Sequence, residues 1–174
     1  VFDSYSCRLG KGTFQGINRC AHHIRSCTQN WQIPAYALQL DIRGYFMSIN
    51  KEILYDLLCR SIAKRRRVQC PWTGLPWEQS VDYGLIDFLL RGVLFRDPVK
   101  DCLVIGDGSE WDGFPADKSL RLSRRPGVGL PIGDLTSQLF SNVYLNPLDQ
   151  FVKRELRCRH YGRYVDDSYI IHPA

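Results

Sequence analysis

Residues 160–172 read HYGRYVDDSYIIH and form the clearest structural pattern in this chain. Aromatic and β-branched residues make two short β-prone runs, His160–Tyr164 and Ser168–His172, with an acidic turn between them. This pattern predicts a β-hairpin with Asp166 and Asp167 at its tip. Adjacent carboxylates in such a place can bind a divalent cation, which makes phosphoryl transfer the first hypothesis. Asp pairs also occur in ordinary turns, where they hydrogen-bond nearby backbone amides.

A second run with strand character precedes another carboxylate far upstream. Apolar residues alternate from Tyr36 to Leu40, the period of a half-buried strand, and the run ends at Asp41. If this strand lies beside the hairpin in one sheet, Asp41 and Asp166 come together. Carboxylates gathered in this way repel each other unless a cation intervenes. Mg²⁺ typically binds one or two carboxylates plus substrate phosphates, and two such ions about 4 Å apart stabilise an in-line displacement.

The rest of the chain predicts a globular α+β fold. The chain has 174 residues, 44% of them hydrophobic, which suits one domain or most of one. N-cap residues and helical periodicity predict helices from Thr13, Asn50 and Asp134, and Pro147 is expected to end the last of these and start another. Residues 96–131 are rich in Gly, Pro and Asp and are expected to be irregular, apart from a hairpin around residues 103–105.

Two apolar stripes at helical spacing are expected to pack into the core. They consist of Ile53, Leu54, Leu57, Leu58 and Ile62, and of Val81, Leu85, Phe88 and Leu89. Leu135, Leu139 and Val143 mark the helix that follows Asp134.

The net charge of +5 suits a polyanionic partner without requiring one, since Lys and Arg number 23 against 18 Asp and Glu. The basic residues form two groups, and a solvated face explains each group as well as phosphate contact does. The groups are Arg60 with Lys64, Arg65, Arg66 and Arg67, and Lys118 with Arg121, Arg124 and Arg125.

The seven cysteines form no C-x-x-C pair and no zinc-finger spacing, so we expect reduced thiols in a cytoplasmic protein. No apolar run is long enough to span a bilayer, and the N-terminus lacks a signal-peptide pattern, so we expect no membrane partner. The chain starts and stops as though within a domain, and we expect it to be a segment of a longer protein.

Two phosphate- or metal-binding motifs are excluded. A P-loop requires Ser or Thr after Gly10-Lys11, where the chain has Gly12. An EF-hand starting at Asp107 would put Trp111 at its third ligand position.

Four segments, taken together, resemble reverse transcriptases. Asp41–Phe46 (DIRGYF), Gly129–Gln138 (GLPIGDLTSQ) and Tyr164–Asp167 (YVDD) are similar, in order and spacing, to three successive palm motifs of that family. Asp3–Thr13 (DSYSCRLGKGT) is similar to the fingers motif of bacterial members. The resemblance covers nearly the whole chain and implies an RNA-directed DNA polymerase, a nucleotidyltransferase.

The resemblance also implies an architecture. The fold would be the fingers and palm of a right-hand polymerase, with an antiparallel palm sheet packed on helices. Residues 1–35 would be part of the fingers, and residues 36–174 would be the palm with an intervening fingers segment at about 60–125. The first fingers strands, the later palm motifs and the thumb would be absent from this chain.

Site residues follow from the matched motifs. Asp41 and Asp166 would hold two Mg²⁺ ions, or Mn²⁺, with Asp167 beside them and the backbone of Ile42 completing a metal shell. Other matched positions would contact the dNTP, the primer or the template. Arg8 would contact the dNTP phosphates, Lys11 a phosphate or the template, Phe46 the ribose 2′ position and Ile132, Gly133 and Gln138 the nascent pair, with Tyr164 and Val165 near the primer and template.

Ile132 and Gln138 also resemble the residues at these positions in diversity-generating retroelements, whose reverse transcriptases copy a template RNA with errors at adenines. That resemblance implies template RNA, a DNA or RNA primer, the cDNA, dNTPs and a small basic accessory protein as partners, in a bacterial or phage-encoded system. Anti-phage defence reverse transcriptases carry similar residues. A non-catalytic RNA-binding module on the same fold is the alternative from another functional class.

Overall fold

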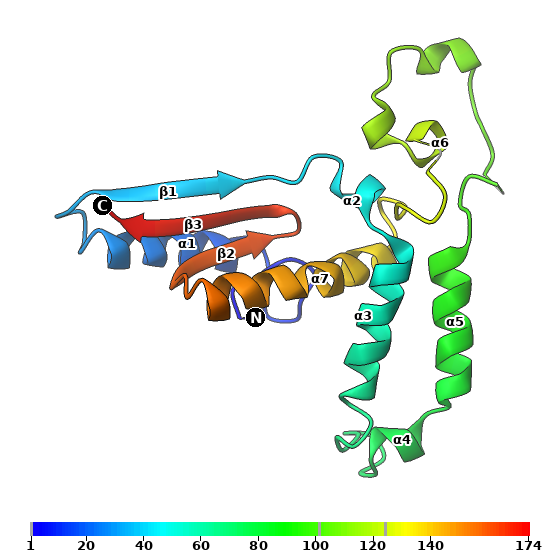
Figure 1. Cartoon of the computed structure of the whole chain (residues 1–174), viewed down its shortest axis with the longest axis horizontal. Helices are drawn as coiled ribbons and strands as arrows, with labels where there is room; N and C mark the ends of the chain where they lie inside the picture. The colour runs from blue at the N-terminus through cyan, green and yellow to red at the C-terminus, as the bar shows by residue number, and fades with distance from the viewer. Residues whose placement is uncertain (1, 101, 124) are drawn as a thin grey trace. The chain divides into compact units, whose positions relative to one another are not determined.

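The computed structural model describes residues 2–100, 102–123 and 125–174, so the predicted basic residue Arg124 lies outside the described part of the chain. The chain divides into two compact units. Unit 1 consists of Val1–Tyr45 and Gly133–Ala174, and unit 2 consists of Phe46–Ile132. Helices and one antiparallel sheet together make the fold α+β, as the sequence predicts (Figure 1).

The sheet of unit 1 has three antiparallel strands in the order β1-β3-β2. The hairpin prediction is confirmed, because β2 (His160–Tyr164) and β3 (Asp167–Pro173) pair directly through a two-residue turn. The upstream strand is also confirmed as β1 (Ala35–Leu40), which pairs with β3. The expected half-burial of β1 is wrong: Tyr36, Leu38 and Leu40 are 71%, 52% and 46% exposed, and the residues that alternate with them, Ala37 and Gln39, are exposed as well.

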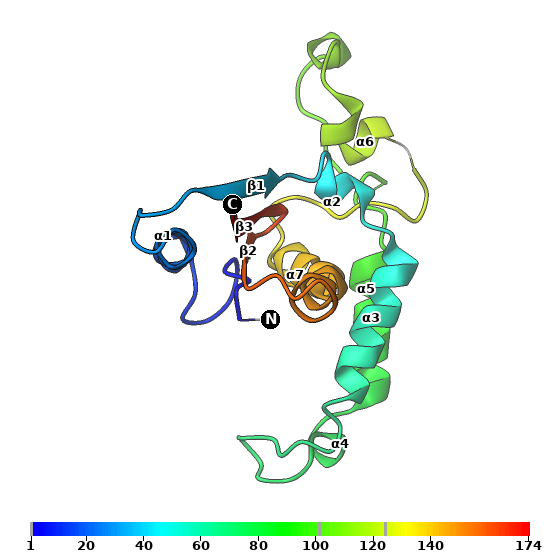
Figure 2. The same ribbon diagram turned by 60° about the vertical axis from the view of Figure 1, so that its left-hand side comes forward.

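Two longer helices accompany this sheet, and both lie on the same side of it (Figures 1 and 2). Helix α1 (Thr13–Cys27) packs against β2 and β3. Thr13 is not its N-cap; Gly12 holds that position, and the Thr13 hydroxyl donates instead to Tyr164 Oη at 3.3 Å. Helix α7 (Leu135–Gln150) begins after Asp134, as predicted, although the Asp134 side chain makes no capping hydrogen bond.

Helix α7 differs from the prediction at Pro147, and its buried face carries polar residues. It continues through Pro147 and ends in a π-helical turn, η3 (Phe151–Glu155), so a single proline costs the helix one hydrogen bond without ending it. Its buried face is also not the apolar stripe, since Leu135 and Leu139 are exposed. The buried positions are Ser137, Phe140, Ser141, Leu145 and Asp149, whose polar members the apolar periodicity could not indicate.

Unit 2 is built around two packed helices, α3 (Lys51–Ala63) and α5 (Tyr83–Phe95). Asn50 caps α3 as predicted, accepting a hydrogen bond from Ile53 N at 3.0 Å. The remaining elements of the chain are short: α2 (Tyr45–Ser48), α4 (Trp77–Ser80), η1 (Gly108–Trp111), η2 (Ala116–Lys118) and α6 (Leu120–Ser123).

Two predictions within unit 2 are wrong. Ile53 of α3 and Leu85, Phe88 and Leu89 of α5 are exposed. Helix α5 buries Leu94 instead and packs against α3. Residues 103–105 form no strand within the described segment 102–123, where turns and short helices follow instead.

All seven cysteines are free thiols, as predicted. Across the described residues, we find no helix with the length and apolar character needed to cross a bilayer.

Candidate active site

The register of the sheet brings the predicted acidic residues to one end of unit 1. Leu40, the last residue of β1, lies opposite Ser168 of β3. Asp41 directly follows Leu40, and Asp167 directly precedes Ser168, so both acidic residues lie at the same end of the sheet. Asp166 lies in the turn between Tyr164 and Asp167, which are paired across the hairpin. Residues from two distant parts of the chain therefore meet at this end of the sheet, which we call the acidic end.

The electrostatics of the acidic end centre on Asp166. Burial is the main effect that raises the pKa of its carboxyl group, and repulsion from Asp41 and from Asp167 raises it further. A hydrogen bond from the backbone of Asp166 and the charge of Arg163 act in the opposite direction. The three carboxylates therefore interact, and a cation placed among them would relieve their repulsion.

The donor set suits a hard cation, since it consists of carboxylate oxygens. Among the described residues, however, no three His, Cys, Asp or Glu side chains converge closely enough to form a metal-binding group. Asp41 and Asp167 are exposed and Asp166 is half-buried. This open arrangement fits Mg²⁺, which takes only one or two protein carboxylates and completes its shell with water and substrate phosphates.

Val165 makes the turn at the acidic end unusual. Its φ of 56° lies in the left-handed region, which β-branched residues rarely adopt and which costs about 1–2 kcal/mol. The guanidinium of Arg163 donates to the Val165 carbonyl and holds this conformation. A strained turn therefore positions Asp166, and a neighbouring side chain stabilises it.

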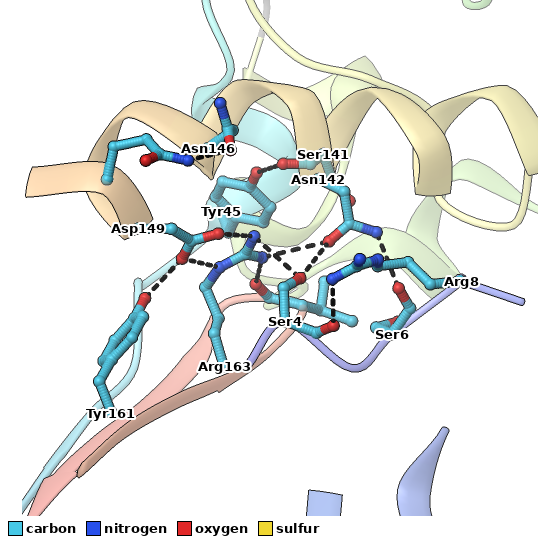
Figure 3. A network of polar contacts seen from close by, with 12 residues as sticks. Ser4, Ser6, Arg8, Tyr45, Ser141, Asn142, Asn146, Asp149, Tyr161 and Arg163 are labelled. Atoms are coloured by element: carbon cyan, nitrogen blue, oxygen red, sulfur yellow. Dashed lines mark hydrogen bonds and ion pairs between the residues drawn. The ribbon is translucent and has the colours of Figure 1, made fainter. Parts of the chain in front are cut away.

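Arg163 is itself fixed by a buried ion pair (Figure 3). Its Nε and Nη2 atoms each donate to a different carboxylate oxygen of Asp149, both at 2.8 Å. Tyr161 Oη donates to the same carboxylate at 2.6 Å. Arg163 and Asp149 are each 1% exposed, so the pair is shielded from solvent. Hydrogen bonds from Arg163 and Tyr161 satisfy the buried carboxylate of Asp149. We call Tyr161, Arg163 and Asp149 the anchor cluster.

The segment similar to a fingers motif lies along the free edge of β2. Arg163 N donates to the Asp3 carbonyl at 2.9 Å, and Tyr5 N donates to the Arg163 carbonyl at 3.0 Å. Asn142 of α7 holds this segment through two hydrogen bonds: it accepts from Ser4 Oγ at 3.2 Å and donates to the Ser6 carbonyl at 2.9 Å (Figure 3). The start of the chain is thus tied to the anchor cluster.

Other predicted site residues in unit 1 lie on or near this segment. Arg8 is exposed, and its Nη1 donates to the Ser4 carbonyl at 2.9 Å. Lys11 Nζ lies 3.2 Å from the ring centroid of Phe2. The Cys7 thiol donates to Gln138 Oε1 at 3.2 Å, which joins the loop before Arg8 to α7.

The remaining predicted residues divide between the units. Tyr164 is 42% exposed, Ile42 is half-buried, and Gly133 has a φ of 103°, a conformation that favours glycine. Phe46 and Ile132 belong to unit 2, where the Phe46 carbonyl accepts a hydrogen bond from Leu130 N at 2.8 Å and Ile132 is exposed.

An apolar groove of about 430 Å³ borders the acidic end within unit 1. Helix α1 contributes Ile17 and Cys20 to its lining, and the sheet contributes Leu38. Tyr164 and Asp167 lie at its border with the acidic end.

Sequence reasoning missed the anchor cluster. Two signals in the sequence could have indicated it. Asp149 lies between the apolar residues Leu148 and Phe151 of a predicted helix, and Arg163 shares a face of the predicted strand with Tyr161. Two buried charges of opposite sign near each other are usually paired.

Comparison of the chain with protein-family models gives no match, and comparison with curated proteins gives none either.

Proposed function

We propose that this chain is the catalytic part of an RNA-directed DNA polymerase that joins dNTPs to a primer on an RNA template. The observation that carries the proposal is the acidic end, where Asp166 interacts electrostatically with its neighbour Asp167 and with Asp41, which is far away in the sequence. The motifs that contain these residues occur in the order and spacing of reverse transcriptases. The division into fingers and palm stays a prediction that belongs to this proposal.

The roles of the residues follow from this chemistry. Asp41 and Asp166, with Asp167 and the Ile42 carbonyl, would hold two Mg²⁺ ions. When bound, such ions stabilise the charge on the attacking and leaving oxygens of an in-line displacement. The anchor cluster would keep the turn that carries Asp166 in place, and the exposed Arg8 guanidinium would bind dNTP phosphates in the bidentate manner of arginine.

The finer proposal is error-prone cDNA synthesis in a diversity-generating retroelement. It rests on Ile132 and Gln138, which match the residues of those elements. An apolar Ile132 side chain offers no hydrogen bond to the nascent base pair. Without such a bond, the site discriminates less well between correct and incorrect base pairs. Template RNA, a primer, dNTPs and a small basic accessory protein are the corresponding partners.

The rival proposal is a non-catalytic RNA-binding module. One observation favours it: within residues 2–100, 102–123 and 125–174, no three potential metal ligands converge on one point. The retention of all three carboxylates at the acidic end favours catalysis, because their mutual repulsion has no evident structural benefit.

Primer extension on an RNA template, with dNTPs and Mg²⁺, tests the proposal in the natural protein that carries this sequence. We expect cDNA synthesis that Asp166→Ala abolishes. Asp56→Ala is the matched control, since it removes an exposed carboxylate from unit 2, and it should leave synthesis unchanged. RNA binding without any extension, with the accessory protein present, would establish the rival proposal.

Sequencing the cDNA tests the finer proposal. Errors concentrated opposite template adenines support a diversity-generating retroelement. Accurate copying contradicts that assignment and leaves the polymerase intact, whereas products unrelated to the template indicate a defence-type enzyme.

A further inference from the structure

Unit 2 contains a cavity of about 720 Å³ that the proposed polymerase chemistry does not use. Its walls come from the start of α3, the residues that end and follow α5, helix α6 and the segment 125–129. This volume lies within the range of sites that hold small organic ligands, which is about 300–1,000 Å³. We call it the unit 2 cavity.

The lining of the unit 2 cavity has an excess of positive charge. Lys51, Arg121 and Arg125 contribute three cations, whereas Asp97 contributes one carboxylate. Lys51 is only 7% exposed, and burial lowers the pKa of its ammonium group, although the charge of Asp97 opposes this shift. A buried ammonium group that is not fully neutralised favours an anion beside it.

The position of Lys51 is fixed by the backbone around it. Its Nζ donates to the Arg96 carbonyl at 3.1 Å, which ties the start of α3 to the end of α5. Its backbone N donates to the Gly127 carbonyl at 3.0 Å. The ammonium has three donors, so a ligand can accept from it without displacing Arg96.

The segment behind Lys51 is closely packed. Gly129 N donates to the Ile49 carbonyl at 2.8 Å, and the side chain of Leu120 occupies the space that a Cβ at Gly129 would need. Gly129 also has a φ of 98°, a conformation that favours glycine. This wall of the cavity therefore has a defined backbone conformation.

We propose that the unit 2 cavity binds a small organic phosphate of nucleotide size. Its terminal phosphate would reach Lys51, with Arg121 and Arg125 contacting the same phosphate chain. The apolar part of the lining offers a surface for a base or a similar flat group. That part consists of Phe95, Pro98, Val99, Leu120, Pro126 and Val128.

The burial of Lys51 favours a small phosphate over an RNA strand. An internal phosphodiester carries its neighbouring nucleotides with it and is contacted at an open surface, where the exposed Arg121 and Arg125 lie. A terminal phosphate projects from its carrier and can enter a cavity. The inference does not depend on the proposed polymerase activity, because every residue involved lies in unit 2 and none belongs to the acidic end.

Calorimetric titration of the 174-residue chain with ATP tests the proposal. The buffer contains EDTA, so that no divalent cation can recruit the nucleotide to the acidic end. We expect ATP to bind, adenosine to bind much more weakly, and Arg121→Gln/Arg125→Gln to weaken ATP binding at least about tenfold, since charge-assisted hydrogen bonds to phosphate are lost. Asp166→Ala should leave ATP binding unchanged.

Arg65→Gln/Arg67→Gln is the matched control, because it removes the same charge from exposed positions of unit 2 outside the cavity. Equal weakening by both double variants would show non-specific attraction and overturn the proposal. Absence of ATP binding would also overturn it, as would tighter binding of a short single-stranded RNA that depends on the same two arginines. Lys51→Met should abolish ATP binding, and circular dichroism shows whether that variant remains folded.

Discussion

At the residue scale, Arg163 has the most demanding position in unit 1. It is almost fully buried, pairs with Asp149 and also holds the carbonyl of the strained residue Val165. Removing one partner of such a pair leaves an uncompensated buried charge. The residue therefore links the stability of unit 1 to the position of Asp166.

We predict that Arg163→Met lowers the free energy of unfolding by about 3–5 kcal/mol, as measured by urea denaturation. Arg91→Met is the control: it breaks the exposed pair with Asp87 and should cost far less, because solvent screens that pair. The double variant Arg163→Met/Asp149→Leu should recover much of the loss, because it removes both charges. A double variant as unstable as Arg163→Met would show that shape and not charge dominates this position.

At the element scale, the pairing of β2 with β3 depends on a glycine. Gly162 lies opposite Tyr169, and a Cβ at Gly162 would come within 2.5 Å of the Tyr169 ring. The strand therefore accommodates an aromatic side chain directly over its backbone. This contact lies close to the turn that carries Asp166.

Gly162→Ala should therefore destabilise the chain by about 1–3 kcal/mol, since overpacking a core typically has this effect. Gly92→Ala is the matched substitution in α5, where a Cβ would meet open space. It should stabilise the chain by about 0.5–1 kcal/mol, because alanine favours a helix interior over glycine. Thermal denaturation of both variants measures the two effects, and shifts of the same sign would contradict the packing at Gly162.

Helix α1 contributes a buried histidine to its contact with β3. His23 is 2% exposed and shares a hydrogen bond of 3.1 Å with Tyr169 Oη. Burial lowers the pKa of His23 from 6.5 to about 4; the nearby Asp3 opposes this shift, and the surrounding cations add to it. The cations that face His23 are Arg19, His160 and Lys153.

Because the folded state holds the pKa of His23 below that of the unfolded state, the unfolded state binds more protons as the pH falls. The free energy of unfolding should therefore decrease through the window from pH 6.5 toward pH 4, with a His23 contribution of about 2 kcal/mol between about pH 7 and pH 5. Urea denaturation at these two pH values measures it. His23→Gln should reduce the dependence, whereas His22→Gln, at an exposed neighbouring position, should preserve it.

At the scale of the whole molecule, the chain forms two units, and unit 2 is inserted between the two segments of unit 1. Contacts concentrate within each unit, which is the condition for separate cooperative regions. The acidic end belongs wholly to unit 1 and the proposed phosphate cavity wholly to unit 2. The two sites can therefore be altered separately.

We predict that Gly162→Ala increases amide hydrogen exchange in β2 and β3 and leaves the exchange of α3 and α5 at the wild-type rate. Hydrogen exchange followed by mass spectrometry measures both regions in one experiment. An equal increase in α3 and α5 would show that the chain unfolds as one cooperative body.

The sequence by itself determined the hairpin, the strand that ends before Asp41 and the cap at Asn50, because these features depend on local periodicity and on hydrogen bonds between near neighbours. Tertiary structure alone decided which helix faces are buried. In α7 the buried face carries Ser137, Ser141 and Asp149, and the carboxylate of Asp149 is satisfied by Tyr161 and Arg163 of β2, outside the helix. Tertiary structure likewise decided the pairing within the anchor cluster and the lining of the unit 2 cavity, because each depends on charges that only the folded chain brings together.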